Sequence, residues 1–184
     1  TSLAGTEQFK KCAEIIRSEP ERRYIVVSAP GKRSEKDEKV TDLLILAAET
    51  GGKEAEEILT KIQSRYKVIV RGLKADIDID GEFAEIFSAL GDPAKKDFII
   101  SRGEYLNAKI LSSYIGFDFI DARAVIFFDE KGDYDEEKTR SVLGRVLEKH
   151  ERAVIPGFYG SLPDGRIKTF SRGGSDITGS IVAR

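Results

Sequence analysis

Short strand-like runs alternate with stretches of helical periodicity along this chain, and the alternation limits the possible folds more than any other feature. Tyr24–Val27 and Val154–Pro156 are brief, apolar and β-rich, as buried strands are. Further strands are expected near 117–121 and 124–128. Because strands that alternate with helices form parallel sheets covered by helices, the sequence predicts an α/β fold with a mostly parallel sheet.

Apolar residues at helical spacing predict helices over most of the remaining chain. Lys67–Val70 resembles a strand in isolation, but helical spacing continues from Ala55 to Leu73, so one long helix is expected there. Thr6 is the expected N-cap of the first helix. The helices are expected around residues 9–16, 40–50, 54–73, 83–90, 93–114, 135–149 and 176–184.

Two connecting segments carry clear local signals. Residues 163–165 (Pro-Asp-Gly) predict a tight turn, since proline fixes φ and glycine accepts positive φ, and Arg166–Phe170 is the expected far arm of a hairpin. Residues 32–39 are almost all charged, so we expect this loop to make no packing contacts and to be mobile. A lid over a site and a disordered surface loop are the two interpretations, and the second is favoured.

Composition narrows the class of protein. The 184 residues suit one domain, and 40% apolar with 34% charged residues suits a folded one. Thirty Lys and Arg against 32 Asp and Glu give a net charge of −2, which argues against a general nucleic-acid binder. No apolar run is long enough to span a membrane, and one cysteine allows no internal disulfide, so a cytoplasmic protein is expected. The chain contains no Met, so we expect a fragment of something longer.

Three glycine-bearing loops follow predicted strands or hairpin arms, where ligands bind in open α/β sheets. They are Ser28–Gly31, Gly157–Gly160 and Ser171–Asp176. The last is the most informative, because two adjacent glycines expose backbone N–H groups ahead of a helix N-terminus. A well-capped helix would explain its serine and aspartate alone. Arg172 beside the glycines favours anion binding, since a cap needs no guanidinium.

Other candidates are weaker when taken singly. The sequence Ser-Arg-Gly-Glu at 101–104 is read from the residues alone as a helix junction with a solvated glutamate. Thr41 and Asp42 need be no more than residues that cap a helix. Asp78, Asp80 and Glu82 resemble part of a calcium loop, but the spacing is wrong, and His150 has no partner at metal-ligand spacing, so no metal site is predicted. No P-loop or G-x-G-x-x-G motif is present.

These segments together resemble the aspartate kinase branch of the amino-acid kinase family. Residues 1–4 (Thr-Ser-Leu-Ala) are similar to the end of the family's Lys-Phe-Gly-Gly-Thr-Ser signature. Residues 26–31, followed by Thr-Asp-Leu-Leu at 41–44, are similar to the second motif, and 101–104 match the Ser-x-Gly-Glu element. The run 157–178 matches the last motif and is the most specific part. The four motifs stand in the family's order and span essentially the whole chain.

The resemblance implies a three-layer αβα sandwich of the amino-acid kinase (carbamate kinase-like) fold, here incomplete. It implies ATP-dependent phosphorylation of the side-chain carboxylate of L-aspartate to 4-phospho-L-aspartate, the first step towards lysine, threonine and methionine. L-Aspartate, ATP and Mg²⁺ are the implied ligands, and a homodimer is the implied assembly. Neither a nucleic acid nor a membrane is an expected partner.

Residue roles follow from the resemblance position by position. Arg172 would pair with the α-carboxylate of aspartate, and Glu104 would face its ammonium. Thr41 would help to place the substrate, Ser28 would lie close to the same site, and Asp176 would be the catalytic residue that orients a lysine or organises the reacting groups. Donors to substrate or phosphate would come from Gly173, Gly174 and Ser175.

The chain is expected to be a single domain, 1–184, that forms the amino-acid-binding part of a kinase catalytic domain. The signature lysine would precede Thr1, and the nucleotide half and the ACT regulatory domains would follow, so the chain alone is expected to have little activity. Two alternatives stay open. One is a kinase of this fold for another acceptor, such as glutamate, acetylglutamate or a nucleoside monophosphate. The other is a ligand-binding module without catalysis. Arg172 with Glu104 favours a small zwitterion.

Overall fold

A three-stranded parallel sheet organises the molecule. The computed structural model describes residues 3–171 and 173–184. The strands β1 (Tyr24–Val27), β3 (Ala153–Pro156) and β2 (Asp118–Phe119) lie in the order β1-β3-β2, all parallel. Val27 pairs with Pro156, so the carboxyl ends of β1 and β3 meet at one edge of the sheet. The predicted parallel α/β sheet is confirmed.

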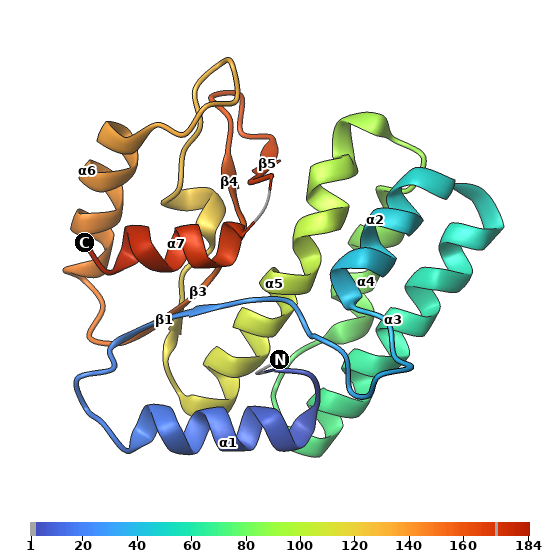
Figure 1. Ribbon diagram of the computed structural model, residues 1–184, viewed down its shortest axis with the longest axis horizontal. Helices are drawn as coiled ribbons and strands as arrows, with labels where there is room; N and C mark the ends of the chain where they lie inside the picture. The colour runs from blue at the N-terminus through green and yellow to red at the C-terminus, as the bar shows by residue number, and fades with distance from the viewer. Residues whose placement is uncertain (1–2, 172) are drawn as a thin grey trace.

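The sheet separates two apolar cores, as successive residues of a strand point to opposite faces. Val154 of β3 belongs to one core, and its neighbours Ala153 and Ile155 belong to the other. Helices α1 (Thr6–Arg17) and α5 (Lys96–Ile115) contribute to the first core, and α6 (Glu136–Leu147) and α7 (Gly174–Val182) lie with the second. The arrangement has helical, sheet and helical layers (Figure 1), which confirms the predicted sandwich.

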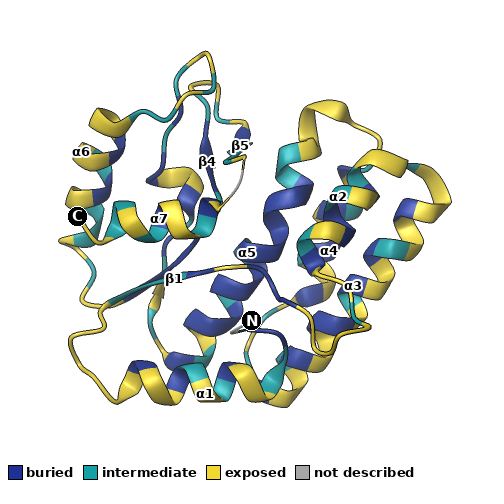
Figure 2. Cartoon of the chain, viewed as in Figure 1, coloured by how far each residue is buried: buried dark blue, intermediate teal, exposed yellow. Residues whose placement is uncertain are grey.

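Helix α5 is the central element of the larger core. It packs against all three strands on one side and against α2 (Val40–Thr50) on the other. Figure 2 shows α5 as largely buried, while the outer faces of the neighbouring helices are exposed. Helix α3 (Gly52–Leu73) runs unbroken, as predicted, because Tyr66, Ile69 and Leu73 form one buried stripe. Helix α4 (Ile79–Ser88) follows α3, and the short 3₁₀ turn η1 (Pro93–Lys95) precedes α5.

The expected hairpin is present. Strands β4 (Tyr159–Ser161) and β5 (Ile167–Thr169) pair antiparallel, and Gly165 has a φ of 83° in the turn that joins them. The Asp97 carboxylate at the start of α5 accepts hydrogen bonds from the backbone N–H and the hydroxyl of Thr169, each 3.1 Å long. The hairpin is thereby attached to the central helix.

The prediction of a strand at 124–128 is wrong. Ala122–Ala124 form a 3₁₀ turn, η2, capped by the carboxylate of Asp121, which accepts from the N–H of Arg123 at 2.9 Å. Phe127 and Phe128 make only isolated bridges. The N–H of Phe127 donates to the hydroxyl of Thr139 at 3.0 Å. The hydroxyl of Thr139 on α6 therefore accepts from an N–H group that, in a strand, would donate to the neighbouring strand.

Thr6 is not the N-cap of the first helix. Gly5 occupies that position, and Thr6 is the first helical residue. The Thr6 side chain packs against Gly72, where a Cβ would lie 2.6 Å from the threonine hydroxyl oxygen. The contact joins α1 to the end of α3, so packing between helices replaces the cap that local sequence predicts.

The expectation that loop 32–39 makes no packing contacts is also wrong. Arg33 and Asp37 form a two-pronged ion pair, with both nitrogen–oxygen distances 2.8 Å. The side chain of Arg65, 6% exposed, lies beneath the loop and approaches Asp37 to 3.5 Å. Helix α3, which begins 13 residues after the end of this loop, therefore fixes the loop through Arg65.

In the described part of the chain, no helix is long and apolar enough to cross a membrane.

Candidate functional site

The carboxyl ends of β1 and β3 place two of the predicted loops side by side. The N–H of Gly157, just after β3, donates to the carbonyl of Val27 at the end of β1, at 2.9 Å. Ser28 therefore begins its loop beside Gly157. Ligands bind at this edge in open α/β sheets, so the geometry agrees with the expected place of the site.

A cavity of about 320 Å³ runs beside α1 and β1 to this edge, and three of the predicted site residues line it. Ser28 reaches it from β1, and Ser175 and Asp176 reach it from the first turn of α7. The remaining wall is mostly apolar and comes from Leu3, Cys12, Ile15, Ile16, Ile25, Val26, Val27 and Leu111. The exposed N–H groups and dipole of α7 favour an anionic group near Ser175.

Two glycines shape the entry to α7. Gly173 has a φ of 62°, a left-handed conformation that suits a residue without a side chain. A Cβ on Gly174 would lie 2.7 Å from the Phe158 ring and 2.9 Å from its Cα. The hairpin and the helix N-terminus can approach this closely only because position 174 has no side chain. The predicted Gly173, Gly174 and Ser175 thus form the N-cap and the first two residues of α7.

Gly157 packs directly against Ser175 in the first turn of α7, and its replacement provides a direct test. A Cβ there would lie 2.7 Å from the Cα of Ser175, a backbone atom that cannot rotate away. Gly157→Ala is expected to cost about 1–3 kcal/mol in the free energy of unfolding and to displace α7. Gly179→Ala in α7 is the control, since beyond the neighbouring backbone of its own helix no described heavy atom lies within 4 Å of the new methyl group. Urea denaturation of both variants measures the difference; equal stabilities would contradict the packing described here.

Glu104 lies in the buried middle of α5, next to the loop after β1. It is 4% exposed, and its neighbour Gly103 packs so closely that an added Cβ would lie 2.7 Å from Ala29. Burial raises the pKa of Glu104 to about 7, although the Ala29 N–H and Arg102 oppose the shift. Its Oε2 atom has no hydrogen-bond partner among the described residues. The interpretation of Glu104 as a solvated side chain is therefore wrong.

Asn107 is a candidate site residue that the sequence analysis missed. It is fully buried one turn after Glu104, and its Nδ2 donates to the carbonyl of Ser28 at 2.8 Å. Its Oδ1 has no partner in the described part of the structure. Glu104 and Asn107 thus each have a buried acceptor oxygen without a hydrogen-bond partner near the loop after β1. Such acceptors favour a cationic donor. A polar residue on the buried face of a helix was the available signal.

Other predicted residues lie apart from the cavity or outside the described residues. Thr41 occupies the first turn of α2 and is half-buried, and it does not line the cavity. The predicted roles of Arg172, and of Thr1 and Ser2 in the opening motif, fall outside the described residues. Asp78 is the N-cap of α4, and its carboxylate accepts from the N–H of Gly81 at 3.0 Å. No cluster of three metal-ligating side chains occurs among the residues described.

Comparisons with known proteins agree with this arrangement. The profile of the amino acid kinase family matches residues 1–184. Aspartokinase 3 of Bacillus subtilis is 36% identical over 201 residues, covering 100% of this chain and 44% of the relative. The crystal structure of Clostridium acetobutylicum aspartate kinase superposes with a TM-score of 0.93 at 46% identity, over 100% of this chain and 43% of that one. E. coli aspartokinase III, solved with lysine and aspartate, superposes with a TM-score of 0.84 at 25% identity, over 100% and 44%. The chain spans less than half the length of these relatives.

Proposed function

Because the chain belongs to the amino acid kinase family, we propose that it is the amino-acid-binding part of an aspartate kinase. The reaction is phosphoryl transfer from Mg·ATP: a side-chain carboxylate oxygen of L-aspartate bonds to the γ-phosphorus, and the bond to ADP breaks. Similarity over the whole chain to B. subtilis aspartokinase 3 and to the C. acetobutylicum enzyme supports this activity. The product, 4-phospho-L-aspartate, is a precursor for lysine, threonine and methionine in this proposal.

The chemistry suits the residues at the site. The nucleophile is a carboxylate already ionised at neutral pH, so the reaction needs no general base. It needs instead fixed donors and positive charge around the transferring phosphoryl group. The N-terminus of α7, with Gly173, Gly174 and Ser175, supplies donors of this kind. Asp176 at the same end is proposed to orient a cationic group at the reacting atoms.

The orphaned carboxylate oxygen of Glu104 is the observation that carries the choice of substrate. A buried acceptor without a donor is costly, and a bound ammonium removes the cost. We propose that Glu104 receives the substrate ammonium, that Arg172 receives its α-carboxylate, and that Ser28 and Thr41 bound the same space. The complex of E. coli aspartokinase III contains aspartate, which agrees with a zwitterionic ligand.

The alternative acceptors that lack an ammonium fit less well. Acetylglutamate has no ammonium, so it would leave Glu104 buried without a partner, at a cost of about 1–3 kcal/mol. A nucleoside monophosphate also lacks that group. A binding module without catalysis would keep the Glu104 site and lose the phosphoryl transfer. An aspartate kinase, a kinase for another acceptor and a binding module therefore differ in which ligands bind and in whether ADP forms.

The remaining parts of the proposal concern the whole protein. Mg²⁺ is proposed to enter with ATP, because Mg²⁺ usually binds through substrate phosphates together with one or two carboxylates. Residues 1–184 form one domain, and the nucleotide-binding half and ACT domains belong to the rest of the protein. A homodimer and a cytoplasmic location complete the proposal.

The test is an assay of the full-length gene product with L-aspartate and Mg·ATP. ADP release is measured, and the acyl phosphate is trapped with hydroxylamine. We expect an aspartate-dependent hydroxamate. Turnover only with glutamate, acetylglutamate or a nucleotide would show a different acceptor, and folded protein that binds aspartate without forming ADP would be a binding module.

A further inference from the structure

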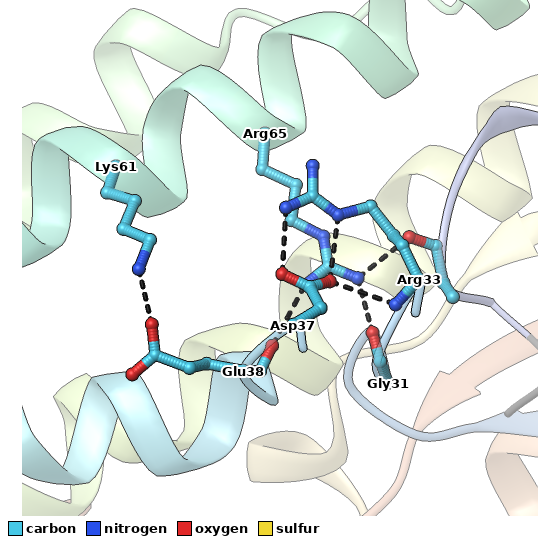
Figure 3. Close-up of polar contacts among 7 residues, drawn as sticks. Gly31, Arg33, Asp37, Glu38, Lys61 and Arg65 are labelled. Atoms are coloured by element: carbon cyan, nitrogen blue, oxygen red, sulfur yellow. Dashed lines mark hydrogen bonds and ion pairs between the residues drawn. The ribbon is translucent and has the colours of Figure 1, made fainter. Parts of the chain in front are cut away.

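Arg65 lies outside the proposed substrate site, yet it contacts three segments that surround it. Its side chain is 6% exposed beneath loop 32–39 (Figure 3). Nη2 donates to the carbonyl of Ala4 at 2.8 Å and, by a short bond, to the carbonyl of Gly31. Nη1 donates to the carbonyl of Glu38 at 3.3 Å. One guanidinium therefore contacts the segment that precedes α1, the loop after β1 and the two residues before α2.

The three contacted carbonyls stand next to residues of the proposed site. Gly31 is three residues after Ser28, and Glu38 is three residues before Thr41. Ala4 directly follows Leu3, which lines the cavity with Ser28 and Asp176. The guanidinium therefore contacts the backbone three residues from Ser28 on one side of the loop and three residues from Thr41 on the other.

Asp37 fixes the guanidinium in turn. Its carboxylate accepts from Nε and Nη2 of Arg33 and from the Arg33 N–H, at 2.8 to 2.9 Å, and it lies 3.5 Å from Nη1 of Arg65. These contacts hold the pKa of Asp37 well below its usual range, chiefly through the hydrogen bond from Arg33. Lys61, one turn earlier on α3, pairs with Glu38 at the same loop. The loop is thus attached to α3 at two successive turns.

Stability alone does not account for this arrangement. Two arginines share the one aspartate, and the Arg65 Nε is buried without a partner among the described residues. Buried ion pairs often contribute no more stability than apolar residues of the same volume. A planar cation with several donors is, however, suited to holding carbonyls from separate segments at fixed distances.

We propose that Arg65 is a positioning residue for aspartate binding, which holds Ser28 and Thr41 at the spacing the substrate needs. The inference rests on the proposed function for its kinetic consequence and on the contacts above for its structural one. Arg65→Lys keeps the charge and loses the fork of donors, and Arg65→Met keeps the volume and loses both. Asp37→Asn leaves the three carbonyl contacts intact and removes the charge that orients them. Arg71→Lys, at an exposed position on the same helix, is the control.

The experiment combines steady-state kinetics of the full-length gene product with hydrogen–deuterium exchange of residues 28–41. A misplacement of about 1 Å can change activity by up to about 100-fold, so both Arg65 variants are expected to raise the aspartate KM by about 10- to 100-fold. The KM for Mg·ATP is expected to stay unchanged, and exchange is expected to rise only in 28–41 and around Ala4. The melting temperature is expected to fall, and less in Arg65→Lys than in Arg65→Met, because the carbonyls of Ala4, Gly31 and Glu38 lose their donor. Asp37→Asn is expected to give a smaller effect of the same kind, and it remains informative if an Arg65 variant does not fold.

Three results would overturn the proposal. The first is faster exchange in 28–41 with an unchanged aspartate KM, and the second is an unchanged exchange rate in that segment. The third is faster exchange throughout the protein in Asp37→Asn and Arg65→Lys, which would show a purely structural role. If the parent protein does not phosphorylate aspartate, the proposed function fails, and the exchange of 28–41 still decides whether Arg65 holds the loops.

Discussion

Replacing Asp176 with asparagine is expected to lower kcat for aspartate phosphorylation by about 100- to 1,000-fold, the range seen when one preorganised electrostatic group is removed. Asp176 is exposed in the first turn of α7 and lines the cavity with Ser28 and Ser175. Asparagine has nearly the same volume, so the cavity keeps its shape and loses only a charge. Because that charge acts on the reacting groups in the proposed mechanism, the aspartate KM is expected to change little.

The measurement is steady-state kinetics of Asp176→Asn beside Glu54→Gln, which removes an exposed carboxylate from the first turn of α3. Each loses a favourable interaction with a helix N-terminus, worth about 0.3–1 kcal/mol, so their stabilities are expected to fall by similar amounts. A kcat near that of the parent enzyme would remove Asp176 from the catalytic machinery. A large rise in the aspartate KM with an unchanged kcat would make it a binding residue instead.

The fold could be predicted where the information is local. Tyr24–Val27 is a strand because it is a short apolar run, and α3 runs to Leu73 because one stripe of residues is buried along its length. The predictions failed where a distant partner decides. Phe127 donates to Thr139 on α6, and the charged loop 32–39 is held by Arg65 on α3. Neither partner can be read from the segment itself.

The candidate site, like the fold, could be predicted only in part. The glycine-bearing loops after predicted strands, together with the family resemblance, brought Ser28 and Asp176 into the predicted site, and the structure places both on one cavity. Asn107 and Arg65 were missed, because a single polar residue on an apolar stripe has no spacing pattern of its own. Both lie on the buried faces of their helices, with Asn107 inaccessible to solvent and Arg65 7% exposed. A charged or amide side chain at a core position is therefore a signal that sequence analysis can use directly.

Glu104→Gln is expected to raise the free energy of unfolding at pH 8 and to weaken aspartate binding at the same pH. In the ligand-free protein, burial raises the pKa of Glu104 from 4.5 to about 7. Between these values the folded protein keeps a proton that the unfolded chain releases. The free energy of unfolding of the parent protein therefore falls as pH rises from about 4.5 to about 7, by at most about 3 kcal/mol.

Glutamine removes this dependence, because it is neutral at every pH and resembles the protonated acid. Glu104→Gln is expected to match the parent near pH 4 and to exceed its free energy of unfolding at pH 8 by up to about 3 kcal/mol. Urea denaturation at the two pH values measures the difference, and Glu54→Gln, exposed on α3, is expected to show none. Parallel pH profiles for Glu104→Gln and the parent would mean that Glu104 is not buried as described.

Aspartate binding is expected to change in the other direction. An ammonium beside Glu104 favours the ionised carboxylate, so binding below about pH 7 releases a proton and the affinity of the parent protein falls as pH decreases. Glutamine offers the ammonium a neutral acceptor, and the loss of a buried charge pair is expected to weaken aspartate binding by about 100-fold at pH 8. Calorimetry in buffers of different ionisation enthalpy measures both the affinity and the released proton. Suppose that Glu104→Gln is more stable than the parent at pH 8 and still binds aspartate as tightly. Glu104 would then destabilise the folded protein without binding the ammonium, and its buried charge would have another role.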